Sequence, residues 1–235
     1  MSLSFDRLVA CLASGIQFLP ATLALTAIAI LTGLLVGGAM ALFRTYRVPV
    51  LSQISAVFVT MYSGIPVMVA LVILNLLYLT QFDNVAAALG WNITVRDVSP
   101  FWVAAVAVTL TATVYVSEAV RGSVLSVDTT QYEAAYSVGL TKWQTIRRIV
   151  IPQFIPVFIP MLCTNIIGTM KSTSIVMTVG VMELLNGSLL PSMKNYSFLE
   201  GYIAAALVYW AISILIEAIS RYAEKRTGEF RAVAQ

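Results

Sequence analysis

Residues 130–152 read TQYEAAYSVGLTKWQTIRRIVIP and form the longest polar, cation-bearing segment between two strongly apolar stretches. Thr130 and Glu133 have the spacing of a capping box, in which the hydroxyl accepts from the third amide and the carboxylate reaches back to the cap. A short helix is expected to follow and to end at Gly139, which has no Cβ penalty in the left-handed conformation. The same capping pattern recurs from Thr141. We therefore expect two short surface helices joined by a glycine turn.

The composition around this segment is that of a membrane protein. Of the 235 residues, 59% are hydrophobic and 11% are charged, whereas a soluble domain has about a quarter charged. The mean hydropathy is +0.88. The expected fold class is an all-α membrane protein, and a single transmembrane domain, residues 1–235, accounts for the whole chain.

Five apolar stretches are long enough to cross a hydrocarbon core of about 30 Å as helices. They are residues 18–43, 51–79, 101–124, 154–182 and 202–220, and the polar coupling segment between the third and the fourth is 128–150. The second stretch is interrupted by Ser63-Gly64-Ile65-Pro66, which frees backbone groups that the bundle or a water-filled cavity must satisfy. The first carries Gly33-x-x-x-Gly37, a spacing that lets two helices approach closely; a lone helix with incidental glycines is the alternative.

The cationic residues are divided unequally between the two sides of these spans. One side holds ten of them, which are Arg44, Arg47, Arg121, Lys142, Arg147, Arg148, Arg221, Lys225, Arg226 and Arg231. The other side holds Arg7, Arg96 and Lys194. The positive-inside rule then predicts a cytoplasmic coupling segment and C-terminus and an N-terminus outside. No internal repeat is visible, which argues against an inverted-repeat secondary transporter.

Residue types argue against several functions. The chain has no histidine, so a His-based metal site or proton relay is excluded, and it has no Walker A sequence for ATP hydrolysis. Its cations lie at span ends rather than in a patch, so nucleic acid is not an expected partner. Cys11 and Cys163 are interpreted as small apolar residues. We expect no catalytic residue, metal site or cofactor in this chain.

Glu118 and Arg121 lie three residues apart on one helical face, near the inner end of the third span, and could pair. One interpretation is an interfacial pair whose charged ends reach the headgroups. The other is a gate or part of a pathway, because carboxylates within membrane spans usually face the bundle interior.

Lys171 lies about 25 Å along the fourth span from its start, at about 1.5 Å per residue, which is past the middle of the membrane. A cation there is costly unless it faces a cavity or a partner. Ser172, Thr173 and Ser174 add hydroxyls, so this cluster is a candidate site for the α-carboxylate of an amino acid. The alternatives are a lysine that snorkels to the outer headgroups and one that bonds a dimer partner.

The triplet Glu133-Ala134-Ala135, followed by Gly139 and then by Ile151-Pro152, resembles the EAA loop of ABC-importer permeases. Tyr115-x-x-Glu118-x-x-Arg121-Gly122 and Lys171-Ser172-Thr173-Ser174 are similar to the polar amino acid subfamily, which serves histidine, glutamine, glutamate, arginine, cystine or opines.

The resemblance extends from about residue 22 to residue 226, with three departures. Members often have Gly-Gln before the triplet, where this chain has Thr130-Gln131-Tyr132. Many have Arg-Gly-Thr-Pro in the second span, where this chain has Ser63-Gly64-Ile65-Pro66 after Tyr62. The Lys-Asp-Thr-Ser pattern stands here as Lys171-Ser172-Thr173-Ser174.

The resemblance implies the transmembrane permease subunit of a type I ABC importer for polar amino acids, in the bacterial cytoplasmic (inner) membrane. Its implied partners are cytoplasmic ATPase subunits that hold ATP and Mg, an identical or paralogous permease and an extracytoplasmic solute-binding protein. The chain itself is then not an enzyme. The residues expected to couple to the ATPase are Glu133, Ala134, Ala135 and Gly139. The pathway or gate candidates are Glu118, Arg121, Lys171, Ser172, Thr173, Ser174 and Pro66.

Glu133 has a more modest interpretation as well, in which it only caps its helix. Two alternative functions also stay open. One is a channel or secondary carrier that needs no ATPase, which ATP-independent flux from this chain alone would favour. The other is a membrane scaffold, which binds a cytoplasmic partner but transports nothing.

Overall fold

The computed structural model describes residues 3–194 and 196–232, and this part of the chain contains helices and no β-strand. Five of its helical segments are long and apolar enough to span a membrane: Phe5–Thr45, Val67–Ala88, Pro100–Leu125, Lys142–Val179 and Phe198–Thr227. The all-α membrane fold expected from the sequence is confirmed.

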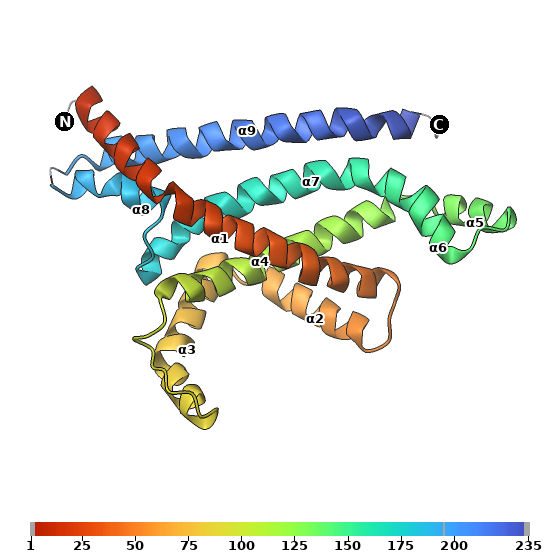
Figure 1. Ribbon diagram of the computed structural model, residues 1–235, viewed down its shortest axis with the longest axis horizontal. Helices are drawn as coiled ribbons and strands as arrows, with labels where there is room; N and C mark the ends of the chain where they lie inside the picture. The colour runs from red at the N-terminus through yellow and green to blue at the C-terminus, as the bar shows by residue number, and fades with distance from the viewer. Residues whose placement is uncertain (1–2, 195, 233–235) are drawn as a thin grey trace.

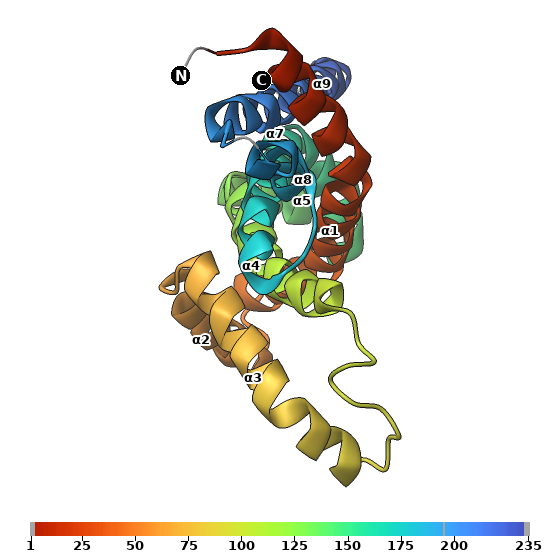
Figure 2. The same cartoon turned by 90° about the vertical axis from the view of Figure 1, so that its left-hand side faces the viewer.

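The long helices cross or run beside one another, and most of the short ones lie toward the two ends of the bundle (Figure 1). The long helices are α1 (Phe5–Thr45), α3 (Val67–Ala88), α4 (Pro100–Leu125), α7 (Ile151–Ser172) and α9 (Phe198–Ala232). The short ones are α2 (Leu51–Ser63), α5 (Thr129–Ser137), α6 (Lys142–Thr145) and α8 (Leu184–Leu189). A π-helical turn (Ile146–Val150) precedes α7, and 3₁₀ turns cover Thr173–Val179 and Pro191–Lys194. Figure 2 shows α2 and α3 set to one side of α7 and α9.

The close packing of α1 on α4 forms the centre of the molecule. A Cβ atom on Gly33 would come within 3.2 Å of the Ala112 carbonyl carbon, and one on Gly37 would overlap the Thr113 carbonyl oxygen. The expected close approach of a second helix to this glycine pair is therefore confirmed. Small buried residues such as Ala112 continue the contact in the hydrophobic core.

The second expected span, residues 51–79, consists of two helices in the structure. The helix α2 ends at Ser63, and Pro66 precedes the first residue of α3, which continues beyond the expected end of the span to Ala88. At the break, the Gly64 amide donates to the Met61 carbonyl at 3.2 Å, which retains a hydrogen bond for an amide outside both helices.

The segment after the fourth span folds back into the bundle. Gly180, with φ +83°, turns the chain, and the fully buried Glu183 caps α8 through the Leu185 amide at 2.8 Å. Its other carboxylate oxygen accepts from the Thr22 hydroxyl at 3.1 Å and the Tyr209 hydroxyl at 2.8 Å. One carboxylate thus joins α1, α8 and α9, a connection between distant residues that no local pattern shows.

Gly37→Ala is expected to lower the free energy of unfolding by about 1–3 kcal/mol, because overpacking a close contact displaces backbone. The measurement is thermal unfolding of the detergent-solubilised protein. Gly38→Ala is the matched control, since a Cβ there meets nothing within 4 Å. Equal stability of the two variants would show that α1 and α4 are not held at this distance.

Candidate functional site

The N-cap of α5 is Asp128, two residues before the expected cap. The Asp128 carboxylate accepts from the Thr130 amide and from the Thr130 hydroxyl, both at 2.9 Å. The predicted capping box of Thr130 and Glu133 is therefore wrong, because Asp128 starts the helix earlier and Thr130 falls inside its first turn. These two hydrogen bonds hold the pKa of Asp128 below its usual range. Glu133 lies exposed on the helix surface and does not cap the helix.

The glycine turn and the second cap agree with the sequence-based expectation. Gly139 has φ +82°, and the Leu140 amide donates to the Ala135 carbonyl at 3.0 Å. Thr141 and Gln144 form a complete capping box, with bonds of 2.9 and 3.3 Å. Both features depend only on neighbouring residues, which is why the sequence reveals them.

The second short helix does not end before the fourth span, contrary to expectation. The helix α6 runs through the π-helical turn into α7, and the Ile151 amide donates to the Ile146 carbonyl five residues back. Pro152 lies in the first turn of α7, where proline is tolerated. The part of the coupling segment that begins at Lys142 and the fourth span are therefore one continuous helical element, Lys142–Val179.

The coupling segment is attached to the bundle on one side and open on the other. The Gln153 amide donates to the Gln131 side chain at 3.3 Å, and the Lys142 ammonium lies 5.3 Å above the Tyr46 ring. Ala135 is buried, whereas Glu133 and Ala134 are exposed. Large apolar side chains also point outward at this end, namely Tyr136, Val138 and Trp143. The open side thus combines a carboxylate, a small residue and apolar groups.

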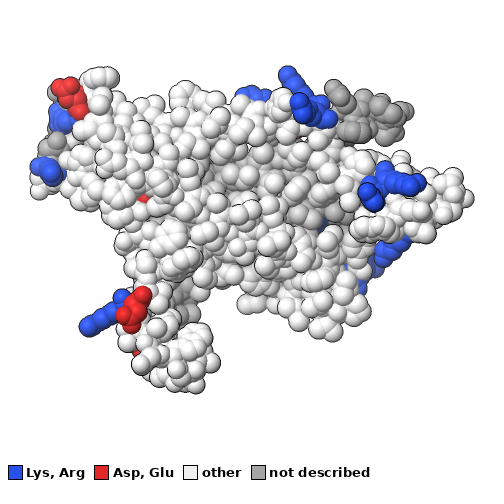
Figure 3. Space-filling view, in the orientation of Figure 1, with Lys and Arg blue, Asp and Glu red and all other residues white. Residues whose placement is uncertain are grey.

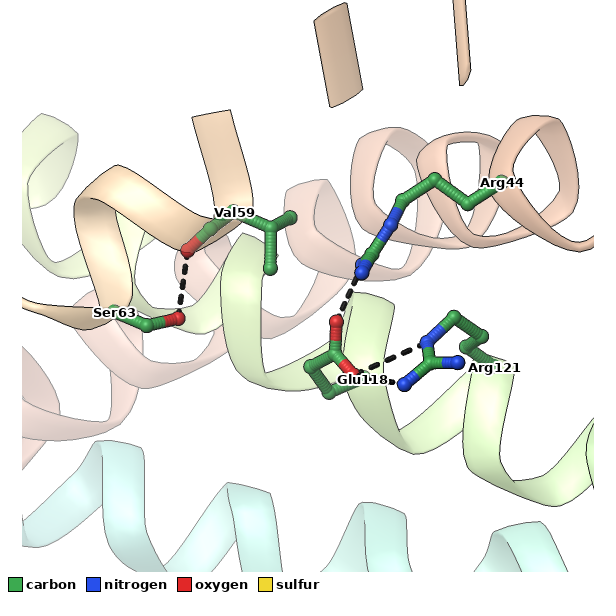
Figure 4. A network of polar contacts seen from close by, with 5 residues as sticks. All are labelled: Arg44, Val59, Ser63, Glu118 and Arg121. Atoms are coloured by element: carbon green, nitrogen blue, oxygen red, sulfur yellow. Dashed lines mark hydrogen bonds and ion pairs between the residues drawn. The ribbon is translucent and has the colours of Figure 1, made fainter. Parts of the chain in front are cut away.

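A three-residue ion cluster connects α1 to α4 (Figure 4). Arg44 donates to one oxygen of the Glu118 carboxylate, and Arg121 donates to the other through two nitrogens at 3.0 and 3.2 Å. The expected pairing of Glu118 with Arg121 is present. The participation of Arg44 was missed, because a contact between two separate spans leaves no spacing signal. About 39% of the Glu118 side chain is exposed, so the cluster borders open space.

The four residues 171–174 do not converge on one site. Thr173 is fully buried and its hydroxyl donates to the Met170 carbonyl at 2.8 Å. The Ser172 and Ser174 hydroxyls also donate to carbonyls of their own helix. Lys171 and Ser174 line a groove between α7 and α9, together with Glu217, which sequence reasoning did not single out.

Pro66 lies beside a narrow cavity of about 30 Å³ at the break between α2 and α3. Tyr62 and Ser63 line it from one side and Thr111 and Tyr115 from α4. The Tyr62 hydroxyl donates to the Ala107 carbonyl at 3.3 Å. The break therefore packs against the central helix on one side, whereas Ser63, Gly64, Ile65 and Pro66 are exposed on the other.

The architecture and the conspicuous motifs match a known family. The family described as binding-protein-dependent transport system inner membrane component matches the sequence over residues 16–229. The chain belongs to this family. The L-cystine transport system permease protein TcyL of Bacillus subtilis (strain 168) is 36% identical to this permease over 211 residues, which cover 89% of this chain and 85% of TcyL.

Further similarity extends over almost the whole permease. The probable amino-acid ABC transporter permease protein PatM of Vibrio harveyi is 27% identical over 97% of this chain and 98% of its own. A solved chain from the crystal structure of an amino acid ABC transporter with histidines superposes with a TM-score of 0.79 and 26% identity, covering 96% of this chain and 100% of that one. The permease therefore has the fold of an ABC transporter membrane subunit.

Replacing Glu118, the carboxylate that both arginines bind, tests how much the ion cluster stabilises the fold. Glu118→Gln leaves two guanidinium groups without a carboxylate, and we expect a loss of about 1–3 kcal/mol in the free energy of unfolding. Arg44→Met should be less damaging in the Glu118→Gln background than alone, and the double-mutant cycle of thermal unfolding measures this coupling.

Arg47→Met is the matched control for Arg44→Met, since Arg47 forms no ion pair within the described part of the chain. Additive effects of the Glu118 and Arg44 substitutions would contradict a direct interaction between the two side chains.

Proposed function

We propose that this permease is the transmembrane subunit of an ATP-driven importer of polar amino acids and that α5 couples it to a cytoplasmic ATPase. The observation that carries this proposal is the exposed Glu133–Ala134 surface on a helix fixed to the bundle by Gln131 and Gln153. The family's dependence on a binding protein and the amino acid transport named for TcyL and PatM support the substrate class.

The coupling contact follows from what the two faces of α5 contain. Ala135 faces the permease, and Ala134 is small enough to let the helix enter a groove on a partner, as amphipathic helices do. Glu133 offers a carboxylate to a basic residue of the ATPase, which holds ATP and Mg. Gly139 sets the angle between α5 and α6, so that movement of α5 is passed on to α7.

The orientation that this coupling requires agrees with the charge distribution. Figure 3 shows Lys and Arg without visible acidic side chains at the end that carries α5, α6 and the C-terminal half of α9, whereas the opposite end shows acidic side chains next to Lys and Arg. By the positive-inside rule, the coupling end is cytoplasmic and the N-terminus is outside. The opposite end then receives the solute-binding protein.

The substrate pathway needs a second permease, identical or paralogous, to complete it. The break at Pro66 and the partly exposed cluster of Glu118 and Arg121 are its gate candidates on the inner side. Lys171, with Ser172 and Ser174 beside it, is its candidate on the outer side. The buried Thr173 stabilises the wall rather than contacting substrate.

Reconstitution of the complex in liposomes tests the function as a whole. We expect uptake of labelled polar amino acids that requires ATP, the ATPase and the binding protein. ATP-independent flux from the permease alone would identify a channel or carrier instead. Co-purification with an ATPase in the absence of any uptake would identify a scaffold.

Gly139→Val is expected to reduce amino acid uptake by about tenfold or more per ATP hydrolysed, because a β-branched residue is strongly strained at φ +82°. The measurement is the ratio of uptake to ATP hydrolysis in proteoliposomes. Gly90→Val is the matched control, since Gly90 has φ +71° and similarly open surroundings but lies in the loop after α3. Equal coupling ratios in the two variants would argue against a role for the Gly139 turn.

Glu133→Arg should uncouple transport from ATP hydrolysis while leaving insertion and unfolding temperature unchanged, because the side chain is exposed and outside the bundle. Glu133→Gln should keep more of the coupling, since its amide still accepts a hydrogen bond. Wild-type uptake by Glu133→Arg would reject the coupling assignment.

A further inference from the structure

An apolar groove lies between the C-terminal part of α1 and the start of α7, and Figure 1 shows α6 and this end of α1 toward the same end of the molecule. The groove has a volume of about 530 Å³ and is lined by α1, α4 and the helical element that begins at Lys142. Among its lining residues only Tyr46 and Trp143 have a polar side-chain atom, and none is charged. The groove is therefore suited to a hydrocarbon ligand rather than to a polar substrate.

The length of the groove corresponds to one leaflet of a bilayer. Leu34 and Tyr46, which line it from α1, are twelve residues apart. At about 1.5 Å per residue this separation is about 18 Å, and half of the hydrocarbon core of a bilayer is about 15 Å thick. The groove can thus hold one acyl chain that extends from the headgroups to the middle of the membrane.

Cationic and amphipathic side chains border one end of this groove. The Lys142 ammonium lies 5.3 Å from the centre of the Tyr46 ring, which lines the groove. Arg47 follows Tyr46 in the chain and is exposed. Trp143 also lines the groove and is 68% exposed, and tryptophan is enriched at the headgroup level of membranes. This end of the groove is therefore suited to lie among the headgroups.

The two cations at this end have no acidic partner in the part of the chain that the structure describes. Neither Lys142 nor Arg47 forms an ion pair or a side-chain hydrogen bond there, and the lining of the groove contains no acidic residue. Arg44, by contrast, is bound by Glu118. An apolar groove with two unpaired cations at one end complements a ligand that has an apolar chain and a negatively charged head.

We propose that the groove binds an anionic phospholipid of the cytoplasmic leaflet, with an acyl chain between α1 and α7 and the phosphate between Lys142 and Arg47. The choice of leaflet rests on the proposed function, which places the coupling end in the cytoplasm. Basic residues next to the cytoplasmic end of a span attract anionic headgroups, whereas a zwitterionic lipid has no net charge to match them.

The position of this lipid connects two parts of the permease that have different roles. On one side is α1, which packs closely on α4 through Gly33 and Gly37. On the other side are Trp143 and the residues that follow it, which belong to the helical element continuous with α7. The lipid therefore fills the space between the central helix pair and the element next to the Gly139 turn.

Quenching of tryptophan fluorescence by brominated lipids tests this proposal in the purified permease. The chain has 4 tryptophans, and Trp91→Phe, Trp102→Phe and Trp210→Phe leave Trp143 as the reporter. All three replaced side chains are exposed, so the substitutions leave the core intact. The protein is reconstituted in vesicles of mixed phosphatidylcholine and phosphatidylglycerol, with bromine on the acyl chains of one lipid or of the other.

The site beside Trp143 should select phosphatidylglycerol over phosphatidylcholine by about fivefold or more, which is the factor that one Lys or Arg contributes near an anionic surface. Arg47→Met combined with Lys142→Met should abolish this selection. Gly38→Leu should also abolish it although both cations remain. A Cβ at Gly38 meets nothing within 4 Å, so the larger side chain extends into the groove without displacing backbone.

Matched controls are available for both kinds of variant. Gly168→Leu is the control for Gly38→Leu, because Gly168 is also a helical glycine with open surroundings but does not line the groove. Arg96→Met combined with Lys194→Met removes two exposed cations that do not border it. Both controls should keep the selection for phosphatidylglycerol.

Three results would overturn the proposal. Equal quenching by the two lipids in the parent protein would show that no selective site is present. Selection retained by Gly38→Leu would show that anionic lipid gathers at the surface without entering the groove. A disulfide between two permease copies through Leu35→Cys, in a background of Cys11→Ser and Cys163→Ser, would show that a second copy covers it. Since quenching requires neither ATP nor an ATPase, it is independent of whether the reconstituted complex transports amino acids.

Discussion

The structure depends on one constraint, which is that hydrocarbon offers no water to a polar group. Helices satisfy their own backbones, so each polar side chain in the spans must be satisfied in another way. Glu118 is bound by arginines from two helices, and Glu183 gathers hydroxyls and amides from three. These two carboxylates connect helices that also pack through small apolar residues and a few other polar contacts. Lys171 and Glu217 stand out because, among the residues that the structure describes, neither side chain has an ion pair or a hydrogen bond.

The same constraint divides the molecule into a fixed part and an incomplete part. The fixed part is α1 on α4, where Gly33 and Gly37 bring two backbones together and leave no space for a side chain. The incomplete part is the outer surface of α7 and α9, which carries free charges and exposed aromatic groups such as Trp210. A transporter needs both, since a rigid scaffold must hold a surface that only substrate or a second subunit completes.

The sequence predicted the turns and caps that involve nearby residues, and it missed the contacts between residues of separate helices. The Gly139 turn and the Thr141 cap were predicted because their bonds close within five residues. The start of α5 was placed two residues late because Asp128 and Thr130 are both good caps and the sequence alone does not rank them. The roles of Arg44 and Glu183 could not be foreseen, because their partners come from other helices. Lys171 was singled out by its depth in the membrane, which follows from the helical rise per residue, and by its place in the motif of residues 171–174.

The continuity of α6 with α7 has a mechanical consequence. Lys142 and Lys171 belong to one helical element and are separated by about 44 Å at 1.5 Å per residue. Such an element acts as a lever, so a tilt of about 5° imposed at the Lys142 end would swing the Lys171 end by about 4 Å. Glu217 is carried by a different helix and does not share this arc. A tilt imposed at the Lys142 end therefore changes the distance between Lys171 and Glu217.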